Sequence, residues 1–264
     1  MLTKIMGVLN VTPNSFSDGG CYINVDEALI AAQKMIAEGA DWIDVGGEAS
    51  NPGAKPISLQ EELDRVMPVI LRLRAETDVQ LSIDTYKPGV MKEAVRAGVG
   101  LINDIKALQE PGALEAASML KAQVCLMHMQ GTPMSMQSAP YYEGSVVDAV
   151  HAFFKARIDA CLNAGIDLAR LWIDPGIGFG KTLQHNIDLL KALAAFHEHK
   201  VPIMLGVSRK SVLGALVDKP VDERVIAGSA VAMFAAGQGI QMIRTHDVDA
   251  TRQVLKILDV LTLD

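Results

Sequence analysis

The feature that most constrains the fold of this chain is a repeated alternation of short apolar runs and helical patterns. Eight short runs of apolar character are each followed by polar loop residues and then by an amphipathic segment. The runs cover residues 4–10, 41–47, 80–84, 100–104, 123–129, 170–174, 202–207 and 239–246. Runs of this kind are typical of strands that are buried on both faces. Their alternation with helices predicts a parallel sheet covered by those helices.

The helical segments carry recognisable start and stop signals. Ser58 and Glu61 have the spacing of a capping box, at the start of a helical pattern over residues 58–76. Pro88 occupies the expected first position of the next helix, and Gly98 follows its expected end. These signals support the helical half of the alternation.

The number of units selects the architecture within the α/β class. No linker or change in composition divides residues 1–264, which predicts a single domain. Eight strand–helix units at this length favour a (β/α)₈ TIM barrel. A doubly wound open sheet is the alternative, but it usually has fewer strands at this length. The segments after the first two strands, 10–20 and 46–56, are rich in turn formers, and we expect mobile loops that close over a site.

Composition excludes several classes of function. The formal net charge of −7 argues against a nucleic-acid binder, because phosphate affinity needs clustered Lys and Arg. No apolar run approaches the length of a membrane span, so we expect no membrane contact. Three cysteines without a pattern, Cys21, Cys125 and Cys161, indicate reduced thiols and a cytoplasmic protein.

The glycine-rich segment "DPGIGFGKT", residues 174–182, is similar to a phosphate-binding loop at first sight. A Walker loop needs a glycine five residues before Gly180, and that position holds Pro175. The dinucleotide pattern also fails, because Gly176, Gly178 and Gly180 are spaced two residues apart. The segment therefore predicts a tight turn at the barrel mouth and no nucleotide site.

The barrel fold places chemistry at the carboxyl ends of its strands. Polar residues occur at all eight of these positions: Asn10, Asp44, Asp84, Asn103, Asp104, His128, Asp174, Ser208, Arg209, Lys210, Arg244 and His246. The carboxylates and amide of Asp84, Asn103 and Asp174 suit a flat heterocycle with several N–H donors, with Lys210 as a donor opposite them. Because acids repel phosphate, we assign Arg244 and His246 to a separate anion end.

Two sets of these residues also have purely structural explanations. Acids at strand ends can simply cap helices or pair with lysines. His197 and His199 are spaced like a metal-binding pair, but they precede a strand and so fall on the opposite face of the barrel. We expect them to be solvated histidines at a helix end.

At this point the chain resembles a known family, the dihydropteroate synthases. The segments that carry the resemblance are "MGVLNVTPNSFSDGG", "GADWIDVGGEASNPGA", "SIDTYKP", "LINDI", "CLMHMQGTP", "DPGIGFGKT", "GVSRKS" and "IRTHDV". The resemblance implies a TIM barrel, commonly a homodimer. It also implies a transferase of folate biosynthesis that uses Mg²⁺ and joins 6-hydroxymethyl-7,8-dihydropterin pyrophosphate to p-aminobenzoate. Sulfonamides would inhibit such an enzyme, because they mimic p-aminobenzoate.

The resemblance also implies roles for individual residues. The pterin would be held by Asp84, Asn103, Met127, Asp174, Gly206 and Lys210. The pyrophosphate would be held by Asn10, Arg244 and His246, with the metal at Asn10. The p-aminobenzoate would be held by Ser50, Pro52, Phe179 and Ser211. Asp18, Lys210, Arg244 and His246 would be catalytic, with Asp18 approaching the reacting carbon when the first loop closes.

The chain departs from the family pattern at two loop positions. Asn14 stands where members usually have Asp, and Asn51 stands where they usually have Arg. Loss of the guanidinium predicts weaker binding of the second substrate, or a slower rate, with the fold intact. A catalytically weak or silent pterin-binding paralogue is therefore an alternative function. A related folate-binding methyltransferase is another, but it needs no pyrophosphate site, so the "RTH" and "SRKS" runs argue against it.

Overall fold

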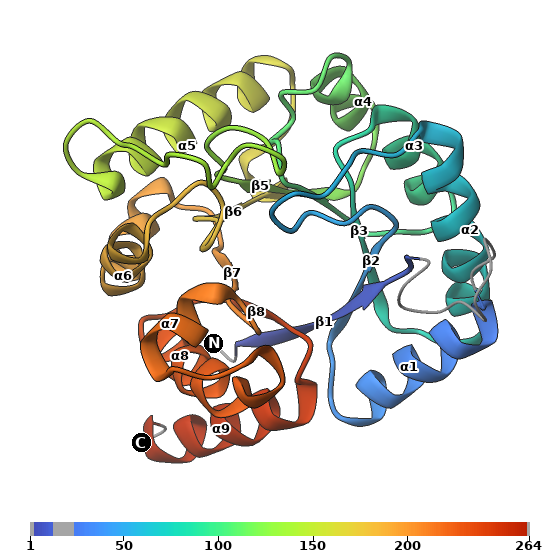
Figure 1. Ribbon diagram of the computed structural model, residues 1–264. Coiled ribbons are helices and arrows are strands. Elements are labelled where there is room, and N and C mark those ends of the chain that lie inside the picture. Colours follow the sequence, from blue (N-terminus) through green and yellow to red (C-terminus); the bar gives the residue numbers. More distant parts are fainter. Residues whose placement is uncertain (1–2, 13–23, 263–264) are drawn as a thin grey trace.

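The computed structural model describes residues 3–12 and 24–262, and in that part of the chain parallel strands are ringed by helices (Figure 1). The strands are β1 (Lys4–Asn10), β2 (Trp42–Gly46), β3 (Gln80–Asp84), β4 (Leu101–Asp104), β5 (Gln123–Met127), β6 (Leu171–Asp174), β7 (Met204–Gly206) and β8 (Met242–Thr245). They form one eight-stranded sheet in the order β6-β5-β4-β3-β2-β1-β8-β7. A bridge between Ile173 and Ile203 joins its two edges. The predicted barrel is confirmed, and each predicted run contains one strand.

Helices follow the strands around the outside of the barrel (Figure 1). The α-helices are α1 (Val25–Ala37), α2 (Leu59–Glu76), α3 (Pro88–Arg96), α4 (Ala113–Met119), α5 (Val146–Asn163), α6 (Leu183–Lys191), α7 (Ser211–Val217), α8 (Val225–Gly237) and α9 (Val248–Thr262). Short 3₁₀ helices are η1 (Leu168–Arg170), η2 (Leu193–His199) and η3 (Val221–Glu223). None of the helices in residues 3–12 and 24–262 is both long and apolar enough to span a bilayer.

The local start and stop signals are mostly as predicted. Pro88 opens α3, and Gly98 follows its end with a φ of +98°. Ser58 caps α2 by accepting a hydrogen bond from the Glu61 backbone N–H at 3.1 Å. The capping box is only half formed, because the Glu61 side chain instead forms an ion pair with Arg65 one turn further along.

The interior of the barrel is built in layers, because alternate residues of each strand face the axis. The lower layer is an apolar cluster of Met6, Trp42, Leu101, Cys125, Trp172, Met204 and Met242. Two residues further along, the same face of the strands carries Val8, Asp44, Asn103, Met127, Asp174, Gly206 and Arg244. An apolar plug therefore lies directly beneath a largely polar floor.

The second predicted loop is anchored at two points. The Glu48 carboxylate forms an ion pair with Lys87, which also pairs with the fully buried Glu62. The Gly53 N–H donates to the Pro133 carbonyl at 3.0 Å. The mobility of this loop stays a prediction, and most of the first loop lies outside the described residues.

Candidate functional site

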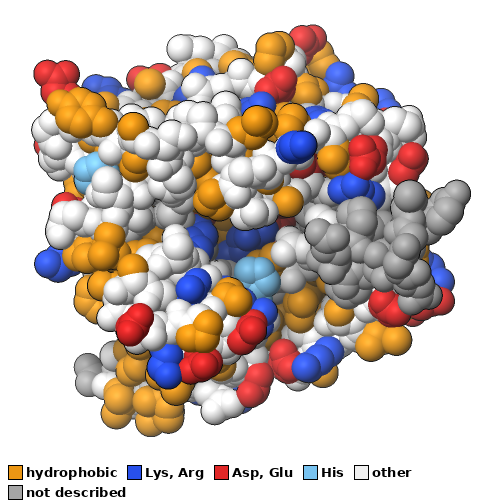
Figure 2. Space-filling view, in the orientation of Figure 1, with side chains coloured by type: hydrophobic (Ala, Val, Ile, Leu, Met, Phe, Trp, Pro, Cys, Tyr) orange, Lys and Arg blue, Asp and Glu red, His pale blue; other side chains and the backbone are white. Residues whose placement is uncertain are grey.

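A cleft of about 500 Å³ opens at the carboxyl ends of the strands. On this face of the molecule, Figure 2 shows Lys or Arg side chains and a histidine gathered at the bottom of a hollow. The lining includes many residues that the sequence singled out: Asn10, Ser50, Pro52, Asp84, Phe179, Lys210, Ser211, Arg244 and His246. The side chain of Asn51 also lines the cleft.

Arg244 is the centre of the polar floor. Its Nε donates to Asp44 Oδ2 at 2.6 Å, and its Nη2 donates to Asp84 Oδ2 at 2.8 Å. The Asn103 amide donates to the same Asp44 oxygen at 3.0 Å. Burial alone would lower the pKa of Arg244, but Asp44 and Asp84 outweigh burial and raise it. Arg244 therefore does not stand apart from the acids of the floor, and its assignment to the anion end stays a prediction.

The acids of the floor have raised pKa values. Burial raises the pKa of Asp84 to about 7, although the Arg244 charge opposes the shift. Burial also raises the pKa of Asp174, opposed by Lys210. Asp174 Oδ1 accepts the Gly176 N–H at 2.8 Å, and a Cβ on Gly206 would approach its Oδ2 to 3.8 Å. Near neutral pH, Asp84 can therefore either donate or accept a hydrogen bond.

Lys210 approaches the floor from the segment that links β7 to α7. The preceding Arg209 adopts a φ of +60°, and its guanidinium pairs with Asp247 at 2.6 Å. Lys210 Nζ donates to the Ile177 carbonyl and lies 4.6 Å from the centre of the Phe179 ring. Burial lowers the pKa of Lys210 to about 8, although the negative charge of Asp174 acts in the opposite direction and raises it. The ammonium is thus close to both the polar floor and an aromatic wall.

The wall around Phe179 is apolar and well packed. Phe179 forms a small buried cluster with Ile105, Met127 and Met136. Such a wall suits the flat face of a heterocyclic or aromatic ligand. Met127, which the family resemblance implies as a pterin contact, lies in this cluster beneath the cleft.

The glycine-rich loop after β6 encloses a lysine that sequence reasoning did not assign. Lys181 is 3% exposed, and its Nζ lies 2.9 Å from the carbonyl oxygens of Gly176 and Phe179 and from His128 Nδ1. A Cβ on Gly176, which has a φ of +65°, would collide with the His128 carbonyl. The loop therefore turns around a buried ammonium. This Gly-Lys pair is a structural element of the loop.

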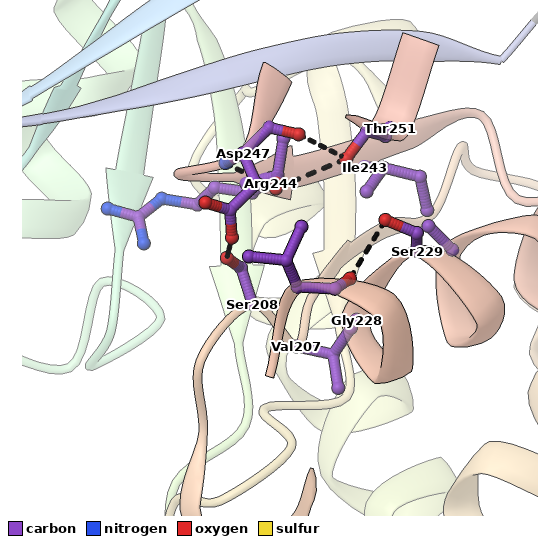
Figure 3. Close-up of a pocket in the computed structure, with 11 residues that line it drawn as sticks. Val207, Ser208, Gly228, Ser229, Ile243, Arg244, Asp247 and Thr251 are labelled. Atoms are coloured by element: carbon purple, nitrogen blue, oxygen red, sulfur yellow. Dashed lines mark hydrogen bonds between the residues drawn. The ribbon is translucent and has the colours of Figure 1, made fainter. Parts of the chain in front are cut away.

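His246 is oriented by a short chain of polar contacts. Its Nδ1 lies 3.1 Å from Ser208 Oγ, which also accepts the His246 backbone N–H at 3.2 Å. Ser208 Oγ in turn donates to Asp247 Oδ2 at 3.3 Å, as Figure 3 shows. Burial, with the neighbouring Arg244 charge, lowers the pKa of His246 to about 4. The imidazole is therefore neutral at pH 7. Because Ser208 Oγ donates its own proton to Asp247, it accepts from His246, so the His246 proton lies on Nδ1.

The remaining residues that the sequence singled out divide into three groups. Asn103, Met127, Asp174 and Gly206 lie beneath the cleft lining and form its floor. Asp104 turns away from the cleft and accepts hydrogen bonds from the backbone N–H groups of Lys106 and Leu108. This acid therefore has the structural role of capping its own loop. Asp18 and Asn14 lie outside the described residues.

Asp44 is the floor residue to which the sequence gave no role. It is fully buried, and within the described residues its Oδ1 has no hydrogen-bond partner. The alternation of side chains along β2 could have indicated its role, because Asp44 lies two residues after Trp42 and so faces the barrel axis as Trp42 does. A charged residue on that side must meet a charge from another strand.

Comparisons with known proteins agree with this site. Residues 6–246 match the family model described as pterin binding enzyme, and the chain belongs to that family. Within it, the chain is 50% identical to the dihydropteroate synthase of Haemophilus influenzae, over 96% of this chain and 92% of the relative. It is 47% identical to the dihydropteroate synthase of Escherichia coli K12, over 97% of this chain and 90% of the relative.

Solved structures give the same result. The Yersinia pestis dihydropteroate synthase in a sulfonamide drug complex superposes with a TM-score of 0.94 at 50% identity, covering 98% of this chain and 94% of that one. The Xanthomonas albilineans enzyme with 4-aminobenzoic acid superposes with a TM-score of 0.93 at 45% identity, covering 100% of this chain and 94% of that one.

Proposed function

We propose that this protein is a dihydropteroate synthase that condenses 6-hydroxymethyl-7,8-dihydropterin pyrophosphate with p-aminobenzoate and releases pyrophosphate. The observation that carries the proposal is the meeting, in one cleft, of a buried acidic floor, an aromatic wall and a group of cations. Relatives at 47–50% identity bear this name. They favour an active synthase over the weak or silent paralogue.

The floor would hold the pterin ring. A pterin presents several N–H donors and acceptors in one plane, and Asp84, Asp174 and Asn103 offer carboxylate and amide groups to match them. The raised pKa of Asp84 gives it either hydrogen-bonding role near neutral pH. Lys210 would donate a hydrogen bond to the ring from the opposite side. The side chain of Met127 and the backbone of Gly206 would lie against the face of the ring.

The upper part of the cleft would hold the pyrophosphate. Arg244 and His246 line it together with Asn10. Mg²⁺ takes oxygen ligands and commonly binds through one or two protein groups plus substrate phosphates. The Asn10 side-chain oxygen at the cleft fits that mode. When bound there with the pyrophosphate, Mg²⁺ would neutralise negative charge on its oxygens.

The outer part of the cleft would hold p-aminobenzoate. Phe179 would pack against its ring, and Ser211 would receive its carboxylate, with Ser50 and Pro52 closing the other side. A sulfonamide shares the aromatic amine of p-aminobenzoate, so the same subsite would take these drugs. The Yersinia pestis and Xanthomonas albilineans structures, with a sulfonamide and 4-aminobenzoic acid respectively, support this subsite.

The reaction breaks the C–O bond between the pterin methylene and the pyrophosphate, and that electron pair leaves with the pyrophosphate oxygen. The amine nitrogen of p-aminobenzoate then forms the new C–N bond and loses a proton. Negative charge grows on the departing oxygen, so Arg244 would stabilise the transition state more than the bound substrate. The charge of a bound pyrophosphate would raise the pKa of His246, and the protonated ring would then donate from Nε2 to the departing oxygen. Asp18 would favour the positive carbon from the first loop.

Pyrophosphate release by the purified protein tests this function. With Mg²⁺ and the dihydropterin pyrophosphate, release should depend on added p-aminobenzoate, and dihydropteroate should appear. Asp84→Asn should abolish most of this activity. Asp104→Asn is a matched control, because Asp104 is a strand-end acid that is fully buried away from the cleft and caps its own loop. Failure to form dihydropteroate when p-aminobenzoate is present, or equal losses in both variants, would overturn the assignment.

We also propose a cytoplasmic homodimer. The described cysteines, Cys125 and Cys161, are buried free thiols, as a reducing compartment favours. Helix α8 packs against α9, yet Ile226 remains 84% exposed and Phe234 53% exposed. In the homodimer the partner subunit would cover these apolar side chains. Sedimentation should give a dimer that Phe234→Glu dissociates, and a monomeric wild-type protein would refute this.

A further inference from the structure

Two histidines and a glutamate meet on the outside of the barrel, between helix α5 and the 3₁₀ helix η2. His151 Nδ1 lies 2.8 Å from Glu198 Oε1 and 3.0 Å from His199 Nε2. The three candidate ligand atoms all lie within 4.8 Å of one another. These residues line a surface hollow that shares no residue with the catalytic cleft. We propose that His151, Glu198 and His199 bind a divalent transition-metal ion of the zinc class.

The first argument is a count of protons. Nδ1 of His151 makes two short contacts, one to a carboxylate oxygen and one to another ring nitrogen. A neutral imidazole nitrogen carries one proton or one lone pair, so it cannot fully satisfy both neighbours. A cation between the three atoms satisfies all of them, because each then presents a lone pair to it.

The second argument is preorganisation of the rings. His151 stacks on Phe196 with ring centres 4.4 Å apart, and His199 packs edge-on against Phe154 at 5.7 Å. Both phenylalanines are fully buried, so they fix the two imidazoles against the core. Tetrahedral zinc with ordinary bond lengths separates its ligand atoms by roughly 3.3 Å. The two contacts of His151 Nδ1, at 2.8 and 3.0 Å, therefore need to open by only a few tenths of an ångström, and Glu198 is exposed enough to adjust its distance from His199.

The donor set selects the kind of metal. Two imidazole nitrogens and one carboxylate suit Zn²⁺, Ni²⁺, Co²⁺ or Cu²⁺, whereas Mg²⁺ prefers oxygen ligands alone. Lys155 lines the same hollow and opposes a cation, but its side chain is exposed and can extend into water.

The position of the site indicates a structural role. Glu198 and His199 end η2, which a short segment over residues 200–203 connects to β7, whereas His151 lies on α5. A bound ion would fasten these two elements together and stabilise the folded chain by mass action. His197, which is spaced like a metal-binding partner of His199, takes no part in the site, because its Nε2 contacts the Gln238 carbonyl at 3.0 Å. Both histidines are partly buried and hydrogen-bonded, so the expectation that they are solvated histidines at a helix end is wrong.

Zinc titration of untagged, chelator-treated protein tests the site. Calorimetry should give one zinc ion per chain, and Co²⁺ should give a visible absorption band that Zn²⁺ removes. His199→Gln and Glu198→Gln should each weaken zinc binding at least about tenfold. Zinc should raise the melting temperature of the wild type, and excess Mg²⁺ should not reproduce that rise.

The matched control is His197→Gln, which changes a neighbouring histidine on the same 3₁₀ helix and should leave zinc binding unchanged. Circular dichroism confirms that each variant is folded, which Glu198→Gln should be because that side chain is exposed. The proposal is overturned if the wild type shows no saturable zinc binding. It is also overturned if the folded His199→Gln and Glu198→Gln variants keep the wild-type affinity.

Discussion

Restoring the missing guanidinium at Asn51 should strengthen use of the second substrate. Asn51 is exposed at the rim of the cleft, and its amide contacts only the neighbouring Pro52 carbonyl, at 3.4 Å, among the hydrogen bonds of the described chain. An arginine there could reach an anion in the cleft without displacing a partner of importance. We therefore expect Asn51→Arg to raise kcat/KM for p-aminobenzoate.

The structure sets the size of the effect. A hydrogen bond to a charged group contributes about 1.5–3 kcal/mol, and ordering the arginine side chain costs up to about 2 kcal/mol. The loop backbone adds little further cost, because it is already held at Glu48 and Gly53 on either side of position 51. The net gain is about 1 kcal/mol, which corresponds to about fivefold in kcat/KM.

Steady-state kinetics with two control variants isolate the cause. Asn51→Met adds length without charge, and Asn51→Lys adds charge without the planar fork. We expect the gain to follow the order Arg, Lys, Met and to shrink at high salt, because the charge is exposed. An unchanged kcat/KM for Asn51→Arg, or an equal gain in Asn51→Met, would refute the reasoning.

Three further predictions follow from buried charges and from the orientation of His246. Lys87→Met leaves the fully buried Glu62 and the partly buried Glu48 without a cation and should cost about 3–5 kcal/mol of unfolding free energy in urea; a loss below about 1 kcal/mol would contradict the pairing. Ser208→Ala should lower kcat/KM about tenfold and shift its pH profile while circular dichroism stays unchanged, because the His246 ring loses its partner; an unaltered profile would exclude this role. His246 has a folded pKa of about 4, below the usual 6.5, so the unfolded chain binds more protons between these values. Its contribution to stability is full above pH 6.5 and is lost as the pH falls towards 4, by up to about 3 kcal/mol. His246→Gln should flatten this part of the stability curve, and an unchanged slope would count against the low pKa.

The sequence by itself determined the architecture and the edge of the barrel that carries the site. Each of the eight strands was marked by its own apolar run, because parallel strands buried on both faces need continuous hydrophobic side chains. Once the barrel is known, strand direction alone places Asp84, Asp174 and Arg244 at one end. These inferences need only local pattern and chain order, so no contact between distant residues had to be known.

Only the tertiary structure decided which polar groups meet. Arg244 was expected to stand apart from the acids, yet it lies between Asp44 and Asp84, 200 and 160 residues away in the chain. His199 was expected to be a solvated histidine at a helix end, yet it contacts His151 on another helix. Pairings of this kind depend on strand register, side-chain direction and the turn that carries each residue. A sequence pattern shows that a buried charge needs a partner, but the packed fold alone selects that partner, because it fixes the distances on which electrostatic energy depends.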